Sequence, residues 1–232
     1  MMTEIKTEDT QIEEIYQLHI RLGGISPMVW RRILIRSDST LEDLHLIIQI
    51  LMNWTNYYLH RFTIRGKEYA VSRMYHVCLN EAKQTTLQDL RLRINERFVY
   101  EYSFFEWWQH HIRLEKRLLV QPRKTYPVCI SGSGAAPPED CGGIDGFMRL
   151  REHFSQAYIL DRFIVFLQYI VHEIPPDEYE TDDGVIMSRF RDEFRTLNYW
   201  FYVDKCDRRT INQRLKWYAR QDDRWIEGLD VI

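Results

Sequence analysis

The chain has 232 residues, of which 45% are hydrophobic and 14% aromatic. This length and composition are enough to bury a core, and they exclude a chain that is disordered throughout. The formal net charge of −3 excludes the overall basic character of many nucleic-acid-binding proteins, although it leaves a local basic face open.

The first 70 residues predict strands around a single helix. Four stretches have the composition or alternation of strands, and they lie at 15–22, 28–36, 59–64 and 68–71. Between the second and third, Leu41, Leu44 and Ile48 recur at helical spacing, and Ser39 and Glu42 have the spacing of a capping box. The order strand, strand, helix, strand suits a sheet with one helix across a face, as in the opening of a β-grasp fold. Residues 1–14 have the composition of a flexible tail.

The middle of the chain predicts a long hairpin. Residues 98–104 and 107–120 read as two strands separated by so little sequence that they are expected to pair. Period two places Tyr100, Tyr102 and Phe104 on one face of the first strand.

The pattern becomes helical after Gly146, and Asp207 stands near the start of the last expected helix. We therefore predict an α+β protein with a mixed or antiparallel sheet, a β-grasp-like opening, a long hairpin and a helical C-terminal third. We expect one domain over residues 15–232, with the helical elaboration at about 147–232.

Two further features bear on the compartment. The most apolar run, residues 163–171, is far shorter than the roughly twenty residues of a membrane span. The polar, acidic start resembles neither a signal peptide nor a transit peptide. We expect a cytoplasmic protein without a membrane contact.

Three stretches in order carry a family resemblance: GISPMVWRRILI with the helix after it, FVYEYSFFEWWQHHIRLEK, and YPVCISGSGAAPPEDCGGIDGF. Together they resemble the plasmid pRiA4b ORF-3-like family, which is named from a plasmid reading frame and also occurs as a passenger in insertion elements. The resemblance covers roughly residues 15 to 150 and implies an α+β domain. It implies no established activity.

The chain departs from the family pattern at the hairpin and at the loop that follows it. Tyr102, Phe104, Trp108 and His110 match the pattern, and Glu106 keeps an acid. Ser103 and Phe105 replace the usual Asp and Gly, and Ala136 replaces a Cys. If the family's acids and cysteines form a site, this chain has lost parts of it.

The segment AAPPEDCGGIDG, residues 135–146, has two interpretations. One is a zinc site in which Cys129 and Cys141 are joined by His110, but structural zinc is usually held by four ligands in closely spaced pairs. The other is a rigid turn, because prolines fix φ and consecutive glycines accept left-handed conformations. The spacing favours the turn, so we expect no cofactor, with zinc as the open alternative.

The hairpin end offers a second candidate site. Glu106, His110 and Trp108 provide an acid, a base and an aromatic wall, and Glu139 and Asp140 of the loop would complete a ligand site. The alternative is a polar hairpin end with a structural role only.

A third candidate is a basic surface for nucleic acid on the first sheet. It would consist of Arg31, Arg32, Arg61, Arg65 and Lys67, with nearby aromatic residues for base stacking. The alternative is a solvated sheet face.

The sequence favours a non-enzymatic binding or regulatory module associated with plasmids and mobile elements, which acts through protein or nucleic-acid contacts. The alternative is a metal-dependent or hydrolytic enzyme that uses Glu106, His110 and the loop of Cys129 and Cys141. The sequence predicts no oligomeric state.

Overall fold

The structure, a computed structural model, describes residues 14–70, 80–173 and 183–227, so the expected tail lies almost wholly outside it. The strands are β1 Glu14–Leu22, β2 Trp30–Arg36, β3 His60–Ile64, β4 Lys67–Ala70, β5 Asn80–Glu81, β6 Arg97–Tyr102, β7 Trp108–Leu119 and β8 Val128–Ser133. The helices are α1 Leu41–Met52, α2 Gly143–His153, α3 Gln156–Glu173, α4 Asp183–Phe201, α5 Arg208–Ala219 and α6 Arg224–Glu227.

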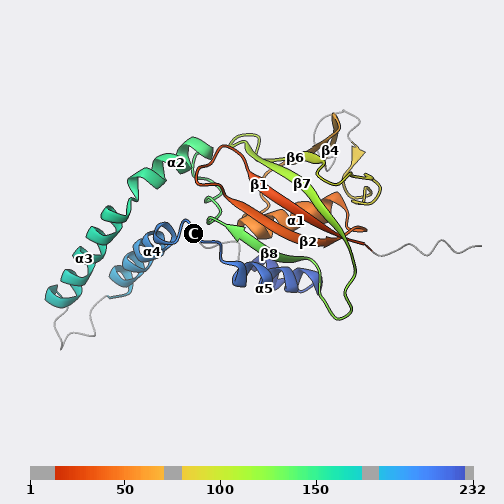
Figure 1. Ribbon diagram of the computed structural model, residues 1–232. Helices are drawn as coiled ribbons and strands as arrows, with labels where there is room; N and C mark the ends of the chain where they lie inside the picture. The colour runs from red at the N-terminus through yellow and green to blue at the C-terminus, as the bar shows by residue number, and fades with distance from the viewer. Residues whose placement is uncertain (1–13, 71–79, 174–182, 228–232) are drawn as a thin grey trace, which may run out of the picture.

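The described strands form one sheet in the order β5-β4-β3-β6-β7-β1-β2-β8 (Figure 1). Neighbouring strands are antiparallel except for the short parallel pair of β4 and β5. The fold is therefore α+β, and the hairpins β1–β2 and β6–β7 confirm the strand pairs expected from the sequence. The β6–β7 hairpin lies between β3 and β1, so the pairs β1–β2 and β3–β4 are not adjacent to each other in the sheet.

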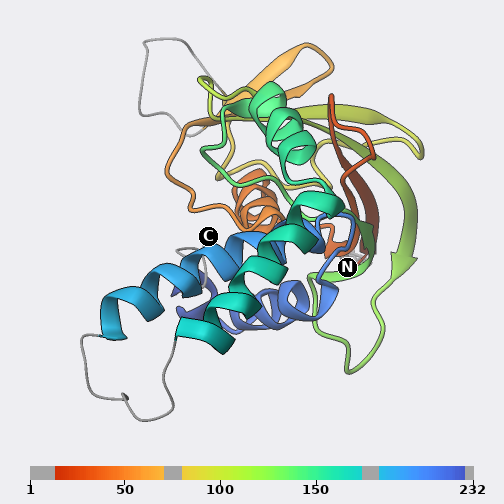
Figure 2. The ribbon, with the colours of Figure 1, turned by 90° about the vertical axis from the view of Figure 1, so that its left-hand side faces the viewer.

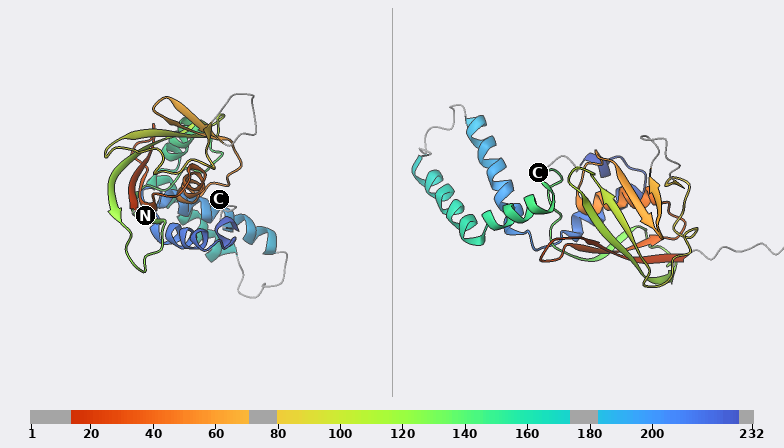
Figure 3. Two further views of the ribbon diagram at one scale, coloured as in Figure 1. Left: turned by 90° about the vertical axis from the view of Figure 1, so that its right-hand side faces the viewer. Right: turned by 90° about the horizontal axis from the view of Figure 1, so that it is seen from above.

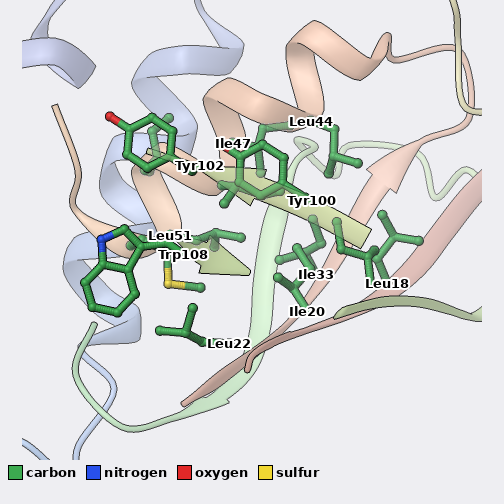
Figure 4. Packing of buried hydrophobic residues seen from close by; sticks show 14 of the residues in the cluster. Leu18, Ile20, Leu22, Ile33, Leu44, Ile47, Leu51, Tyr100, Tyr102 and Trp108 are labelled. Atoms are coloured by element: carbon green, nitrogen blue, oxygen red, sulfur yellow. The ribbon is translucent and has the colours of Figure 1, made fainter. Parts of the chain in front are cut away.

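The core lies where the sheet curls around α1 (Figure 3). Alternation along β1 buries Leu18, Ile20 and Leu22, while the intervening side chains are less buried. Figure 4 shows these side chains meeting Leu44, Ile47 and Leu51 of α1 and the rings of Tyr100, Tyr102 and Trp108.

The N-cap of α1 corrects the sequence prediction by one residue. The side chain of Thr40 accepts from the backbone N–H of Asp43, and a carboxylate oxygen of Asp43 accepts from the N–H of Thr40 at 2.8 Å. The capping box is therefore Thr40–Asp43 rather than Ser39–Glu42.

The helices α3 and α4 project away from the sheet, and the next helix, α5, lies against it again. α2 leads into α3, which lies beside α4 in an arm that projects from the sheet (Figures 1 and 2). Within the arm, the rings of Phe163 and Phe194 are 5.9 Å apart and Arg162 pairs with Glu193. The helical C-terminal third is confirmed, although it begins at Gly143. None of the helices in the described ranges is long and apolar enough to cross a membrane.

α5 packs against α1, β8 and α6. Its N-cap is Asp207, as expected, and the hydroxyl of Tyr218 donates to Asp43 of α1 at 2.7 Å. One predicted position is wrong: Phe104 is exposed beyond the end of β6, because Ser103 turns the chain with a φ of 52°.

Candidate functional site

The loop 135–146 is bound to the core through Glu139. One carboxylate oxygen of Glu139 accepts from both the backbone N–H and the hydroxyl of Thr55, each at 2.7 Å. The other oxygen accepts from the hydroxyl of Tyr102, whose ring is fully buried. Burial, and then this hydrogen bond, raise the pKa of Tyr102 well above its usual value. The loop is therefore fastened to the segment after α1 and to the end of β6.

Two buried indoles hold the backbone of the same loop. Trp54 donates to the carbonyl of Pro137 at 2.9 Å, and Trp108 donates to the carbonyl of Glu139 at 3.1 Å. These donors pair two backbone carbonyl groups of the loop with the core. The loop is thus an ordered cover on the sheet.

The acidic end of the loop lies against the β6–β7 turn. A Cβ at Gly143, which has a φ of 66°, would lie 2.8 Å from the carbonyl oxygen of Glu106, so this close approach requires glycine. Burial, and then the charge of Asp140, raise the pKa of Glu106. Its Oε2 atom is buried and has no hydrogen-bond partner among the described residues.

Cys141 is the third functional group at this end. Burial, followed by the charge of Glu106, raises the pKa of the Cys141 thiol to about 12. It is therefore a protonated thiol at neutral pH, and the thiol is a poor nucleophile compared with the thiolate. Glu106 is therefore a better candidate for acid or base chemistry than Cys141.

His110 does not contribute to the surface at the hairpin end. It is fully buried, with its ring 5.4 Å from the rings of both Trp54 and Tyr100. Neither ring nitrogen has a hydrogen-bond partner in the described part of the chain, and burial lowers the pKa of His110 to about 3. The neighbouring His111 lies on the opposite face of β7 and is only partly buried, as strand period predicts.

The predicted zinc ligands are not assembled. No three His, Cys, Asp or Glu side chains within the described ranges converge in a way that could hold a metal ion. The backbone N–H of Cys129 is bonded to Asn212 of α5, and its Sγ lies 3.4 Å from the carbonyl of Ser131. After burial, the neighbouring Cys206 raises the pKa of Cys129, whereas the charge of Glu106 raises that of Cys141, so the two cysteines have different surroundings.

The predicted basic cluster does not form either. The sheet order places β6, β7 and β1 between β2 and β3, so arginines of these two strands are not neighbours. Three of the five side chains are engaged by carboxylates, in the pairs Arg32–Glu115, Arg61–Glu101 and Arg65–Glu96. Lys67 is exposed, and Arg31 is buried beneath the sheet.

Comparison with known proteins supplies the family. The family model described as "Plasmid pRiA4b ORF-3-like protein" matches residues 14–158. The chain belongs to this family. A curated relative, "Uncharacterized protein y4hQ" from Sinorhizobium fredii, is 25% identical over 143 residues, which are 61% of this chain and 73% of that protein.

A solved structure is also similar. The crystal structure of a protein of unknown function, MM3350 from Methanosarcina mazei Go1, has a TM-score of 0.58 and 30% identity, and it covers 73% of this chain and 92% of that one. The family match ends at the start of α3, so nearly all of the arm and the last helices follow the matched region.

The hairpin of this pRiA4b ORF-3-like chain has an exposed aromatic surface that the sequence did not predict. The turn between β6 and β7, residues 103–107, exposes three large aromatic side chains, and we call it the aromatic turn. Phe105 is 91% exposed, Trp107 50% and Phe104 42%. A signal was present, because Phe-Phe-Glu-Trp stands where tight turns usually carry Gly, Asn or Asp.

The aromatic turn has a defined conformation. Ser103 and Trp107 have φ values of 52° and 58°, and the N–H of Trp107 donates to the carbonyl of Ser103 at 2.6 Å. The hydroxyl of Ser103 accepts from the N–H of Glu106 at 3.2 Å. The rings of Phe104 and Trp107 are 6.0 Å apart, so they form one surface.

Proposed function

We propose that this chain is a non-enzymatic binding module whose contact with a partner protein is the aromatic turn. The observation that carries the proposal is the exposure of Phe105, flanked by the half-exposed rings of Phe104 and Trp107. Scattered exposed apolar side chains are ordinary, but a contiguous group of large rings marks an interaction site. Aromatic anchors of this kind contribute most of the binding energy in protein interfaces.

The hairpin supports the proposal because it fixes the backbone of the aromatic turn. The turn joins two paired strands, and Gly143 of the anchored loop packs directly against Glu106. A backbone that is already ordered loses less conformational entropy on binding. A partner therefore meets a preformed surface.

The surrounding charges favour a protein over a nucleic acid. Glu106 is part of the turn and Asp140 lies near it, and carboxylates repel phosphate. Arg61 lies 5.5 Å from the ring of Phe104, but carboxylates of Glu68 and Glu101 already bind its guanidinium. Stacking of bases on aromatic rings usually requires a cationic groove beside them.

An association with plasmids and mobile elements is part of the proposal, and its support is the description of the family whose model matches residues 14–158.

The test is site-specific crosslinking followed by a binding measurement. The photoreactive amino acid benzoylphenylalanine, in place of Phe105, should crosslink a defined protein in the native host. The same amino acid in place of Leu119, which is 70% exposed at the far end of β7, is the matched control. Against the purified partner, the Phe105→Ala and Trp107→Ala variants should each bind at least about tenfold more weakly, since a central aromatic anchor contributes 2 kcal/mol or more.

Phe105→Ala should leave the melting temperature unchanged, because the side chain is almost fully in water. The proposal fails if crosslinks from position 105 match those from position 119, or if both alanine variants bind the purified partner like the unsubstituted protein. Crosslinks to nucleic acid at position 105 would replace it with a nucleic-acid-binding function.

A second candidate is a hydrolytic enzyme, and Glu106 is the observation that favours it. Its unpartnered buried oxygen and raised pKa are properties of a general acid. Glu106→Gln would abolish any hydrolysis while leaving the affinity for a partner protein at Phe105 nearly intact. A hydrolytic activity of the purified protein that survives this substitution would exclude Glu106 as its general acid, and a purified protein without hydrolytic activity would eliminate the candidate.

A further inference from the structure

A cavity lies between the sheet and the C-terminal helices, away from the aromatic turn. It is open to solvent and has a volume of about 710 Å³, within the range of small-molecule sites. β2, the C-terminal end of α1, α4 and α5 supply its walls, and we call it the α4–α5 cavity. Apolar side chains, including Ile50, Leu51 and Ile211, form much of its lining.

Arg31 lies in the wall of this cavity and is only 2% exposed. Its guanidinium donates to the carbonyls of Trp30 and Ser133 at 2.9 Å and to that of Leu51 at 3.3 Å. No carboxylate of the described residues pairs with it, and its Nη2 donates no hydrogen bond within them. The charge is thus buried with neutral acceptors only.

Arg214 lines the same cavity and is 3% exposed. It donates to Asn53 Oδ1 at 2.6 Å and to the carbonyl of Trp225 at 2.7 and 3.1 Å. It too lacks a carboxylate partner in the described ranges. Buried charges in proteins are normally paired, so two unpaired guanidinium groups at one cavity require an explanation.

The surroundings do not neutralise these charges. Both arginines lie at the C-terminal end of α1, whose dipole supplies only about half a negative charge. Burial raises the pKa of the nearby Cys206 thiol, so it is protonated. Asp207 also lines the cavity, but it is exposed and its carboxylate caps α5 through Thr210.

The mouth of the cavity adds further positive charge. Lys205 and Arg195 are exposed members of its lining, and Arg195 also lies 3.7 Å from a carboxylate oxygen of Asp192. Cations at the rim of a low-dielectric opening attract anions and raise their local concentration.

We infer that the α4–α5 cavity binds a small organic anion, a carboxylate or phosphate monoester on an apolar body. Its charged group lies against Arg31 and Arg214, and its apolar body lies on the side chains of α1 and α5. α4 and α5 follow the region matched by the family model, so the site combines the family's sheet domain with the C-terminal helices of this chain.

The probes are octanoate, octyl phosphate, inorganic phosphate and octanol, measured by isothermal titration calorimetry and by the shift in melting temperature. Octanoate or octyl phosphate should bind with one site per chain and raise the melting temperature, whereas octanol at the same concentration should not. Whichever of the two amphiphiles binds with higher affinity shows whether the charged group of the ligand is a carboxylate or a phosphate. Saturation by inorganic phosphate with the same affinity as octyl phosphate would overturn the assignment of an apolar body.

Arg214→Met removes one buried charge, and Asn198→Trp fills the mouth from an exposed position. Each should weaken binding by at least about tenfold, Arg214→Met because a charged hydrogen-bond donor is lost and Asn198→Trp because the indole occupies the mouth. Arg149→Met, at an exposed position of α2, is the control and should bind like the unsubstituted protein.

The inference is overturned if octanol binds as tightly as octanoate, if neither amphiphile binds at millimolar concentration, or if Asn198→Trp leaves the affinity unchanged. The Asn198→Trp variant decides the question should Arg214→Met fail to fold.

Discussion

Replacement of Glu139 by alanine should release the loop 135–146 from the core. The substitution removes three hydrogen bonds, two from Thr55 and one from the buried Tyr102. A hydrogen bond to a charged group contributes about 1.5–3 kcal/mol, but these three share one partly exposed carboxylate and are not additive. We expect a loss of about 2–4 kcal/mol in the free energy of unfolding. At roughly 2–4 °C per kcal/mol for a chain of this size, the melting temperature falls by about 4–16 °C.

Urea denaturation followed by tryptophan fluorescence measures this loss, because Trp54 and Trp108 donate to the same loop. Glu139→Gln keeps the shape and one acceptor oxygen and should cost less than Glu139→Ala. Glu152→Ala, on the exposed surface of α2, is the control and should stay within about 0.5 kcal/mol of the unsubstituted protein. If Glu139→Ala and Glu152→Ala unfold at the same urea concentration, the loop is not held by this carboxylate.

Three further predictions test the fold. Thr40→Ala should cost about 0.5–2 kcal/mol in a denaturation experiment and Ser39→Ala almost nothing, and equal losses would contradict the assigned cap. Burial lowers the pKa of His60 from 6.5 to about 2. As the pH falls below 6.5, the unfolded chain therefore takes up a proton that the folded protein does not. The contribution of His60 to the free energy of unfolding is full above pH 6.5 and falls below it by up to about 1.4 kcal/mol per pH unit. His60→Phe should reduce this slope in denaturation curves between about pH 6 and 4, and an unchanged slope would show that His60 is protonated in the folded state. At Gly146, an added Cβ would lie 1.9 Å from the carbonyl oxygen of Cys141, so Gly146→Ala should lower the free energy of unfolding by about 1–3 kcal/mol, and a melting temperature equal to that of the unsubstituted protein would refute that contact.

The elements that the sequence predicted correctly are those with a local signal. Alternation in β1 and helical spacing in α1 each reflect burial against one side, which the sequence records directly. The predicted cap of α1 was wrong by one residue because Ser39–Glu42 and Thr40–Asp43 have the same spacing. β8 was missed, since its sequence VCISGS carries Gly and Ser and lacks clear alternation. It becomes a strand by pairing with the edge of β2.

The sites were harder to predict because they depend on contacts between distant segments. The prolines and glycines of the loop 135–146 predicted an ordered turn, but nothing local identifies Thr55 and Tyr102 as the partners of Glu139. The basic cluster was predicted on the assumption that strands close in sequence are close in the sheet. The β6–β7 hairpin separates Arg32 from Arg61, and each is paired with an acid instead.

The composition of the aromatic turn is the strongest argument that it serves binding rather than folding. Left-handed backbone at Ser103 and Trp107 costs of order 1 kcal/mol or more at each residue, and glycine would remove that cost. Phe105 stands where the family pattern has glycine, yet its ring gains almost no burial, with 91% of it in water. Stability therefore favours glycine or a small polar residue in place of Phe105 and Trp107. A partner protein that covers the rings explains why the turn keeps them in water at this cost. The crosslinking experiment at Phe105 detects the contact between the turn and that partner.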